Sequence, residues 1–183
     1  MTELTQQEQA NMDDASQQYL TFIMASEEYG VDILSVQEIR GWEATTVIPN
    51  SPSHVKGVIN LRGTIVPIID LRQRFGIETL EYGATTVVIV VKVAISDEHK
   101  VIGIVVDAVS DVFSVNDADV RDAPDFGDDT NLSFIKGLTN AADKMVILLD
   151  INMLLGSEIL PEASQLSNLI NNIDAPQPQA VNA

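Results

Sequence analysis

The amino-acid sequence predicts an all-β protein built from two copies of one small β module. Its 183 residues include 20 Val and 19 Ile, whereas aromatic residues make up only 5%. β-Branched side chains favour strands over a helical bundle, which would show Leu and Ala at helical spacing. Short apolar runs are separated by turns that contain Gly or Pro, and one pattern of Gly, Asn, Asp and Gly occurs twice. Many short strands with such turns predict a barrel or a sandwich, because open sheet edges invite aggregation.

The internal repeat has two registers. A displacement of 80 residues relates Gly57, Asn60, Asp70 and Gly76 to Gly137, Asn140, Asp150 and Gly156. A displacement of 73 residues relates Gly30, Val31, Ile33, Val36 and Ile39 to Gly103, Ile104, Val106, Val109 and Val112. The difference is an insertion of seven residues, expected in the acidic loop 116–131. The repeat predicts two modules of about five strands each, lying side by side.

Residues 57–76 contain the best-defined local structure. Their sequence predicts a strand, a tight turn in which Gly63 takes a positive φ, and a second strand. Pro67 cannot donate a hydrogen bond to a neighbouring strand, so the second strand is expected at a sheet edge or beside a bulge. Asp70 is placed to cap a helical turn over 71–75, and Gly76 can end that turn.

The other segments follow in chain order. The remaining expected strands are residues 19–24, 29–33, 35–40, 85–95, 101–106 with a continuation over 107–115, 134–138 and 144–149. Residues 150–155 are expected to form a second helical turn. Polar, acidic residues 1–17 predict a disordered tail, 18–160 the folded domain, and 161–183 a C-terminal helix followed by a frayed end.

Composition excludes several classes of function. The chain has no Cys and therefore no disulfide framework, and a net charge of −17 disfavours nucleic acid and anionic membranes as partners. The N-terminus lacks the pattern of a signal peptide, and the longest apolar run is too short to insert into a membrane, so a cytoplasmic location is expected. Lone His54 and His99 lie in turns, and the acidic loop lacks the spacing of a calcium site. We expect no catalytic residue, metal or cofactor.

The repeat helps to separate residues that serve the fold from residues that serve a partner. Asp70 has Asp150 as its counterpart, which favours a cap over a catalytic carboxylate. The arginines of the first copy are not repeated: Arg62 corresponds to Ala142, Arg72 to Asn152 and Arg74 to Leu154. An arginine that the second copy lacks is free to contact a partner. We expect this role above all for Arg62, at a turn tip.

Two other classes of function remain as alternatives. A small-ligand-binding β-barrel would carry a cluster of aromatic residues on one sheet, whereas Trp42 stands alone in the sequence. An enzyme would need an acid–base pair, for which Asp32 and Asp70 are the available carboxylates. Because Asp70 is matched by Asp150, the sequence disfavours the second alternative.

The motifs EYGVDI, VQEIRG, GVINLRG, VPIIDLR, GIVVDAVSDV and RDAPDFG occur in this order between about Tyr19 and Leu160. Together they resemble the CheW family of chemotaxis coupling proteins. The resemblance implies two SH3-like five-stranded β-barrel subdomains around a hydrophobic junction, with strands that can be exchanged between them. It implies a non-catalytic adaptor between the cytoplasmic hairpin tips of membrane-bound chemoreceptors and the regulatory domain of the histidine kinase CheA.

The resemblance also assigns contact residues. For the chemoreceptor tip it implies Val36, Glu38, Arg62, Ile65, Val87 and Val105, the apolar ones near the barrel junction. For the kinase it implies Lys56 on one barrel, and Arg121 and Phe126 on the other. Glu38 is expected to hold the guanidinium of Arg62 in place. Further copies of the chain are expected as partners in array rings, since unlike surfaces in contact propagate until they close.

Overall fold

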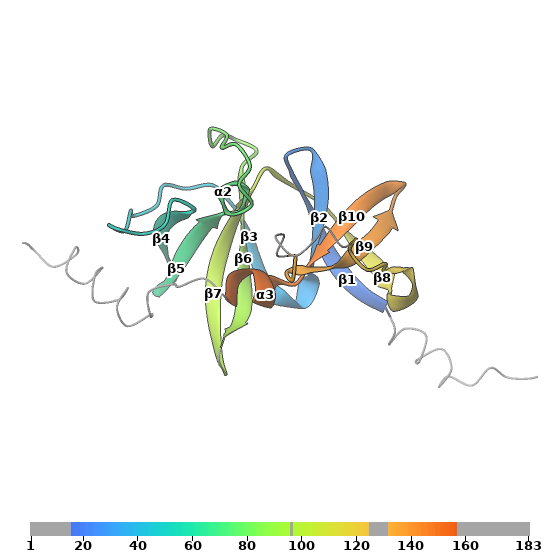
Figure 1. Ribbon diagram of the computed structural model, residues 1–183. Helices are drawn as coiled ribbons and strands as arrows, with labels where there is room; N and C mark the ends of the chain where they lie inside the picture. Colours follow the sequence, from blue (N-terminus) through green and yellow to red (C-terminus); the bar gives the residue numbers. More distant parts are fainter. Residues whose placement is uncertain (1–15, 96, 125–131, 157–183) are drawn as a thin grey trace, which may run out of the picture.

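The computed structural model describes residues 16–95, 97–124 and 132–156, which form two five-stranded sheets (Figure 1). The expected C-terminal helix, nearly all of the expected N-terminal tail and Phe126 lie outside these residues. The strands are β1 (Ser16–Met24), β2 (Glu27–Asp32), β3 (Val36–Gly41), β4 (Val55–Leu61), β5 (Thr64–Asp70), β6 (Val87–Ile95), β7 (Glu98–Val106), β8 (Ala108–Asn116), β9 (Ile135–Ala141) and β10 (Lys144–Leu149). Short helices are η1 (Ile33–Ser35), α2 (Leu71–Arg74), η2 (Asp117–Asp119) and α3 (Ile151–Gly156).

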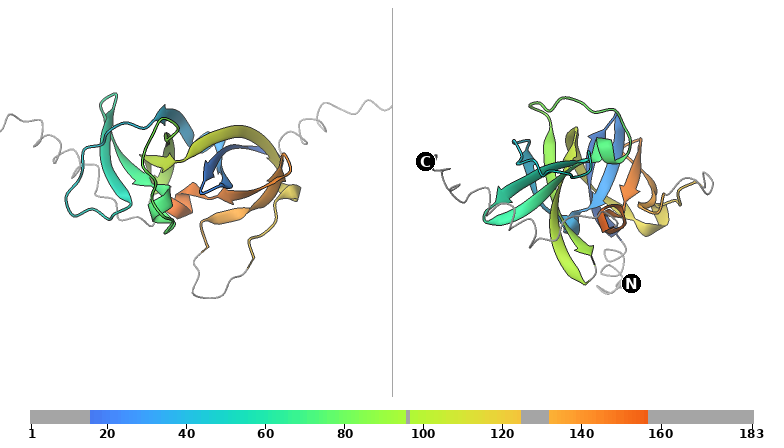
Figure 2. Two further views of the ribbon diagram at one scale, coloured as in Figure 1. Left: turned by 90° about the horizontal axis from the view of Figure 1, so that it is seen from above. Right: turned by 60° about the vertical axis from the view of Figure 1, so that its left-hand side comes forward.

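Each sheet combines strands from both copies of the repeat. Barrel 1 has the strand order β8-β1-β2-β10-β9, and barrel 2 has the order β3-β6-β7-β5-β4. The chain therefore starts in barrel 1, crosses to barrel 2 at η1, and returns after β7. Figure 2 shows the two barrels beside each other from above. Strands are thus exchanged between the two copies: the first two strands of each copy share a barrel with the last three strands of the other copy.

The return to barrel 1 corrects one expected strand. Residues 107–115 do not continue the strand 101–106: β7 ends at Val106, and β8 pairs with β1 in the other sheet. Asp107 is the crossing residue. Its backbone N–H donates to the carbonyl of Ile23 over 3.1 Å, so the turn is fixed to barrel 1 as soon as the chain enters it.

Strand pairing confirms the correspondence between the copies. In barrel 1, Leu148 of β10 pairs in parallel with Gly30 of β2; in barrel 2, Ile68 of β5 pairs in parallel with Gly103 of β7. These are the same two positions after displacements of 80 and 73 residues. A Cβ on Gly103 would lie 2.5 Å from Cδ1 of Ile68, and one on Gly30 would lie 3.0 Å from Cδ2 of Leu148. Glycine recurs here because a large side chain from the parallel neighbour lies across its backbone.

Three apolar clusters hold the barrels together. The largest lies at the junction and takes side chains from both barrels, among them Phe22 and Leu149 from barrel 1 and Ile89 and Ile104 from barrel 2. A smaller cluster fills each barrel, around Val66 in barrel 2 and Leu148 in barrel 1. Shared burial at the junction makes the two barrels one packing unit.

Both expected helix caps are present. Asp70 Oδ1 accepts hydrogen bonds from the backbone N–H groups of Arg72 (2.9 Å) and Gln73 (3.4 Å) at the start of α2. Asp150 Oδ1 accepts the equivalent bonds from Asn152 (3.0 Å) and Met153 (3.1 Å) at the start of α3. The repeated aspartates therefore serve the fold, since each satisfies two N–H groups that a helix start leaves without partners.

Pro67 shows which of the two expected settings is correct. β5 is an inner strand between β7 and β4, and the β4–β5 register shifts between Val55 and Gly57, opposite Ile69 and Ile68. Pro67 therefore lies next to a bulge rather than on an edge strand. Strand β5 pairs with β7 only from Ile68 onward, so the missing N–H of Pro67 removes no hydrogen bond between these two strands.

Candidate partner-binding surfaces

Arg62 lies at the tip of the β4–β5 hairpin and reaches across to β3. Its φ is +50° and that of Gly63 is +87°, so both central residues of the two-residue turn are left-handed, as a type I′ turn requires. Asn60 Oδ1 accepts the N–H of Gly63 over 2.8 Å and supports this turn. The Arg62 side chain is 77% exposed, which leaves most of its guanidinium available to another molecule.

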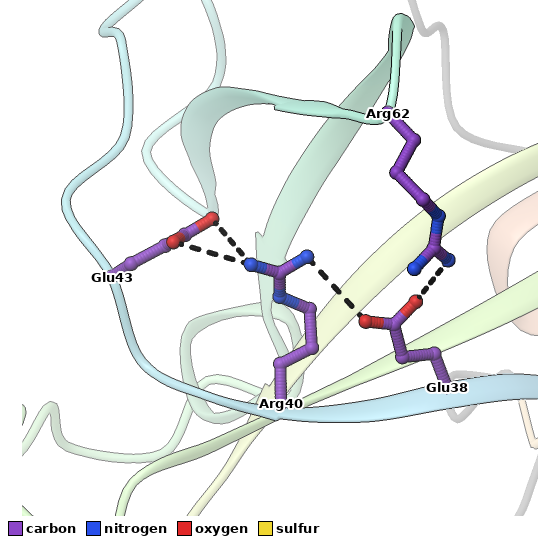
Figure 3. Close-up of polar contacts among 4 residues, drawn as sticks. All are labelled: Glu38, Arg40, Glu43 and Arg62. Carbon is purple, nitrogen blue, oxygen red and sulfur yellow. Dashed lines mark hydrogen bonds and ion pairs between the residues drawn. The ribbon is translucent and has the colours of Figure 1, made fainter.

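An ion-pair chain connects this tip to the opposite edge of barrel 2 (Figure 3). Arg62 Nη2 donates to Glu38 Oε2 over 2.6 Å, which confirms the expected contact between them. Glu38 also accepts from Arg40 at 3.4 Å, and Arg40 contacts Glu43 at 3.3 Å. Because β3 and β4 are the two edge strands of barrel 2, the chain helps to close the barrel and holds the exposed guanidinium in one place.

The other expected receptor residues all lie on barrel 2 but differ in accessibility. Val36 and Val87 are partly buried beside the junction cluster, and Ile65 is partly buried near the start of β5. Val105 differs from the expectation. It is only 3% exposed and packs inside barrel 2, because its position on β7 points toward the interior cluster rather than the junction. A partner cannot reach its side chain directly.

One apolar residue was missed from the sequence. Ile39 lies between Glu38 and Arg40 on the edge strand β3 and is 48% exposed. It pairs with Ile89 of β6, two residues from Val87. Alternation along β3 gave no signal for this exposure, because a strand with one buried face is expected to bury its apolar positions.

The expected kinase residues lie on different barrels. Lys56 is partly buried on β4 of barrel 2, where its carbonyl accepts from the Thr45 hydroxyl over 2.7 Å. Arg121 is exposed after η2 in barrel 1, and its backbone exchanges two hydrogen bonds with Leu138, at 2.8 and 2.7 Å. β4 and β9 lie toward opposite ends of the molecule (Figures 1 and 2), so these positions belong to separate surfaces.

Arg72 is not available to a partner, which corrects the reasoning from the repeat. Its Nε and Nη2 donate to the two carboxylate oxygens of Asp107 over 2.7 and 2.6 Å, and Nη1 donates to the Glu78 carbonyl over 2.8 Å. Asp107 also accepts the N–H of Ala25 over 2.9 Å. The guanidinium holds the pKa of Asp107 below its usual range, chiefly through these hydrogen bonds. Arg72 links α2 of barrel 2 to the crossing point and to the β1–β2 turn of barrel 1.

In the second copy, a shorter side chain links the helical turn α3 to the β6–β7 hairpin. Asn152, the counterpart of Arg72, accepts the N–H of Ala94 directly over 2.9 Å. Ala94 pairs with His99 at the end of the β6–β7 hairpin, as Ala25 lies at the end of the β1–β2 hairpin. An arginine without a counterpart can therefore serve the fold, because the first copy reaches its hairpin through Asp107.

Asp32 and Asp70, the two carboxylates considered for an enzyme, each cap the start of a short helix. Asp32 accepts the N–H of Leu34 over 2.9 Å at η1, and Asp70 is 2% exposed. Asp70 Oδ2 also accepts the hydroxyl of Tyr82, whose pKa is raised first by burial and then by this hydrogen bond. Within the described ranges, no three His, Asp or Glu side chains form a group that could hold a metal, and no helix could span a membrane.

Aromatic residues do gather, contrary to the expectation from the sequence. Trp42 packs against Tyr82 with ring centroids 4.1 Å apart. At the junction, Phe75 stacks between Tyr29 and Phe134, with centroid distances of 5.8 and 5.2 Å. Residues up to 105 positions apart in sequence meet in this stack, so composition alone gave no sign of it.

Comparison with known proteins decides the family. A family model for the CheW-like domain matches residues 18–158, which is most of the chain. The chain belongs to the CheW-like family. The chemotaxis protein CheW of Klebsiella aerogenes is 48% identical over 142 residues, which cover 78% of this chain and 83% of that protein. The CheW of Rhizobium meliloti is 35% identical over 148 residues, covering 81% of this chain and 93% of that protein.

A solved structure agrees with the fold. The crystal structure of the scaffolding protein TtCheW from Thermoanaerobacter tengcongensis superposes with a TM-score of 0.68 at 32% identity, covering 79% of this chain and 97% of that chain. The two SH3-like subdomains predicted from the sequence are thus those of a CheW-like protein. With such relatives, the role of this chain is that of a chemotaxis adaptor.

Proposed function

We propose that this CheW-like chain couples chemoreceptors to the histidine kinase CheA in the cytoplasm and helps to assemble them into arrays. The observation that supports this proposal most directly is the exposed guanidinium of Arg62, which Glu38 holds in place. Exposed Ile39 follows Glu38 on the same edge strand of barrel 2. An adaptor needs surfaces held in fixed relation, and the shared junction core supplies that rigidity. No cofactor enters the proposal.

The receptor surface is the edge of barrel 2 around β3. A chemoreceptor tip is a helical hairpin, and a helix is recognised by an apolar strip with a polar rim. Ile39, Val36 and Val87 supply the strip, and Arg62 and Glu38 supply the rim. Val105, which is buried in the interior cluster of barrel 2, is left out of the contact surface, and Ile65 extends the surface onto β5. Arg62 is the anchor, since an arginine held by a carboxylate loses little freedom when it binds.

The kinase surfaces are at the two ends of the molecule. Lys56 marks the end formed by barrel 2, and Arg121 marks the end formed by barrel 1. Phe126, which lies outside the described residues, is assigned to the same partner as Arg121. The CheA regulatory domain and a second copy of this chain are the proposed occupants. Because the two ends present unlike residues, successive contacts are heterologous and can close into rings.

Arg62→Ala tests the receptor surface. The ion pair with Glu38 is largely exposed, so the free energy of unfolding should change by no more than about 0.5–1 kcal/mol. Affinity for a receptor cytoplasmic fragment should fall by about 1–3 kcal/mol, the range for losing a charged anchor. Affinity for the CheA regulatory domain should change much less. Titration calorimetry against each partner separately measures both.

Lys144→Ala is the matched control. Lys144 is exposed beside the β9–β10 turn, which corresponds to the β4–β5 turn in the other barrel. Its loss should leave receptor affinity unchanged. The proposal fails if Arg62→Ala weakens both partners equally or neither of them.

A further inference from the structure

An apolar groove lies on one flank of the barrel junction and is distinct from the surfaces described above. It encloses about 380 Å³. The residues that line it are partly buried, and we call them the aromatic groove: Tyr29, Phe75, Ile77, Phe134, Ile135 and Ile147, with Arg74 at the same site. Three of the lining rings stack on one another, Phe75 between Tyr29 and Phe134, and burial raises the pKa of the Tyr29 hydroxyl. So much apolar side chain in one open groove indicates an occupant.

On the other flank of the junction, the positions equivalent to the aromatic groove are buried. The counterparts of Tyr29, Ile135 and Phe75 on the other flank are Ile102, Val55 and Leu155. Their side chains are 0%, 8% and 0% exposed. The pseudo-symmetric position is thus closed by the chain itself, whereas the aromatic groove is not.

The difference comes from the two helical turns. α3 has six residues and buries Leu154 and Leu155 in the junction core. α2 has four residues, and the counterparts of those leucines are Arg74 and Phe75. The flank beside α2 therefore lacks the apolar cover that α3 gives to the other.

The segment that follows α3 has the pattern of such a cover. Residues 157–183 lie outside the described part of the chain, and their apolar positions include Ile159, Ala163, Leu166, Ile170 and Ile173. Successive spacings of four, three, four and three place these residues on one stripe of a helix. Ser164, Gln165, Asn168 and Asn171 fall on the other side. A helix with one apolar stripe needs one apolar surface to cover it.

The groove is within reach of this segment. The N–H of Asp150, at the start of α3, donates to the carbonyl of Phe134 in the groove over 2.8 Å. A helix of six residues is about 9 Å long, and the two connecting residues 157 and 158 span up to about 7 Å. Glu158 and Glu162 flank the stripe, opposite in charge to Arg74.

We propose that residues 159–173 fold back as an amphipathic helix and cover the aromatic groove. The stripe packs on the rings of Phe75 and Phe134, and the segment supplies to this flank the cover that Leu154 and Leu155 give to the other.

A pair of charge substitutions tests the docking in the full chain. Leu166→Asp should release the segment, raise the fluorescence of the apolar dye ANS severalfold, and speed amide hydrogen exchange at Ile77 and Ile147. Asn168→Asp adds the same charge on the opposite side of the stripe and should change neither signal. Equal signals from both variants, or none from Leu166→Asp, would overturn the proposal.

Cross-linking identifies the occupant directly, because the natural chain has no Cys. The variant with Ile77→Cys and Leu166→Cys should form a disulfide within one chain on mild oxidation, and faster than the control with Ile77→Cys and Asn168→Cys. Disulfide-linked dimers would show a second copy in the groove. Protection of the groove that appears only after a receptor fragment or the CheA regulatory domain is added would assign it to that partner. Either result rejects the proposal.

Discussion

The Arg72–Asp107 pair should stabilise the fold by joining the two barrels. Two charge-assisted hydrogen bonds connect the side chains, which are 12% and 24% exposed. Exposed ion pairs contribute about 0–1 kcal/mol, and breaking a buried pair costs about 3–5 kcal/mol. Because this pair is buried on one side and reached by solvent on the other, we expect a coupling of about 2 kcal/mol.

A double-mutant cycle measures this coupling. Urea unfolding of Arg72→Ala, Asp107→Ala and the double variant gives the interaction energy. The pair of Arg40 and Glu43 is the control: its atoms are 3.3 Å apart, but the side chains are 28% and 46% exposed. Its coupling should stay below about 0.5 kcal/mol. A coupling for Arg72 and Asp107 no larger than that of the control would refute the reasoning.

The pair also predicts a pH dependence. Arg72 lowers the pKa of Asp107 in the folded chain, whereas an Asp in the unfolded chain has a pKa of about 3.9. The stabilisation is therefore complete above about pH 5 and is lost as the pH falls through about 4 toward the lower, folded pKa. Wild type and Asp107→Ala should converge in unfolding free energy across this acidic window. If the difference between them were the same at pH 7 and at pH 3, the linkage would be wrong.

Two further stability predictions follow from local geometry. Asp70→Ala and Asp150→Ala should each lower the free energy of unfolding by about 0.5–2 kcal/mol, since each removes a helix cap, and titration of the remaining folded protein should show unchanged receptor binding. Lost binding with an unchanged melting curve would instead make the aspartate a contact residue. Gly103→Ala should destabilise by about 1–3 kcal/mol, because its Cβ would lie 2.5 Å from Ile68 Cδ1, whereas Gly83→Ala meets no atom within 4 Å. Thermal unfolding of the two glycine variants compares them, and similar melting temperatures would contradict the close packing.

Much of the local structure could be read from the sequence. The strand positions, the caps at Asp70 and Asp150 and the positive φ at Gly63 depend on residues within a few positions of one another. The same holds for the Arg62 tip, because turn chemistry places it at the end of a hairpin. The contact between Arg62 and Glu38 was also expected, since the family resemblance names both residues for the same partner.

Other features depended on contacts that only the folded chain makes. The partner of Arg72 lies 35 residues away at a crossing that the sequence does not mark, and Val105 points into a barrel rather than toward the junction. The rings of Tyr29, Phe75 and Phe134 meet only because β2, α2 and the start of β9 converge. Such residues carry no local signal, because their environment is set by elements distant in sequence.

The exchange of strands between the copies shows the same limit most clearly. The sequence determined that two equivalent modules exist, since each carries the same glycines, aspartates and apolar alternation. It did not determine which module β3 and β8 would join, because two copies with one pattern offer each strand two edges of matching chemistry. Tertiary structure decided it: after the crossings at η1 and Asp107, strands β3 to β5 and strands β8 to β10 each join the first two strands of the other copy. This arrangement buries residues of both copies in one shared junction core.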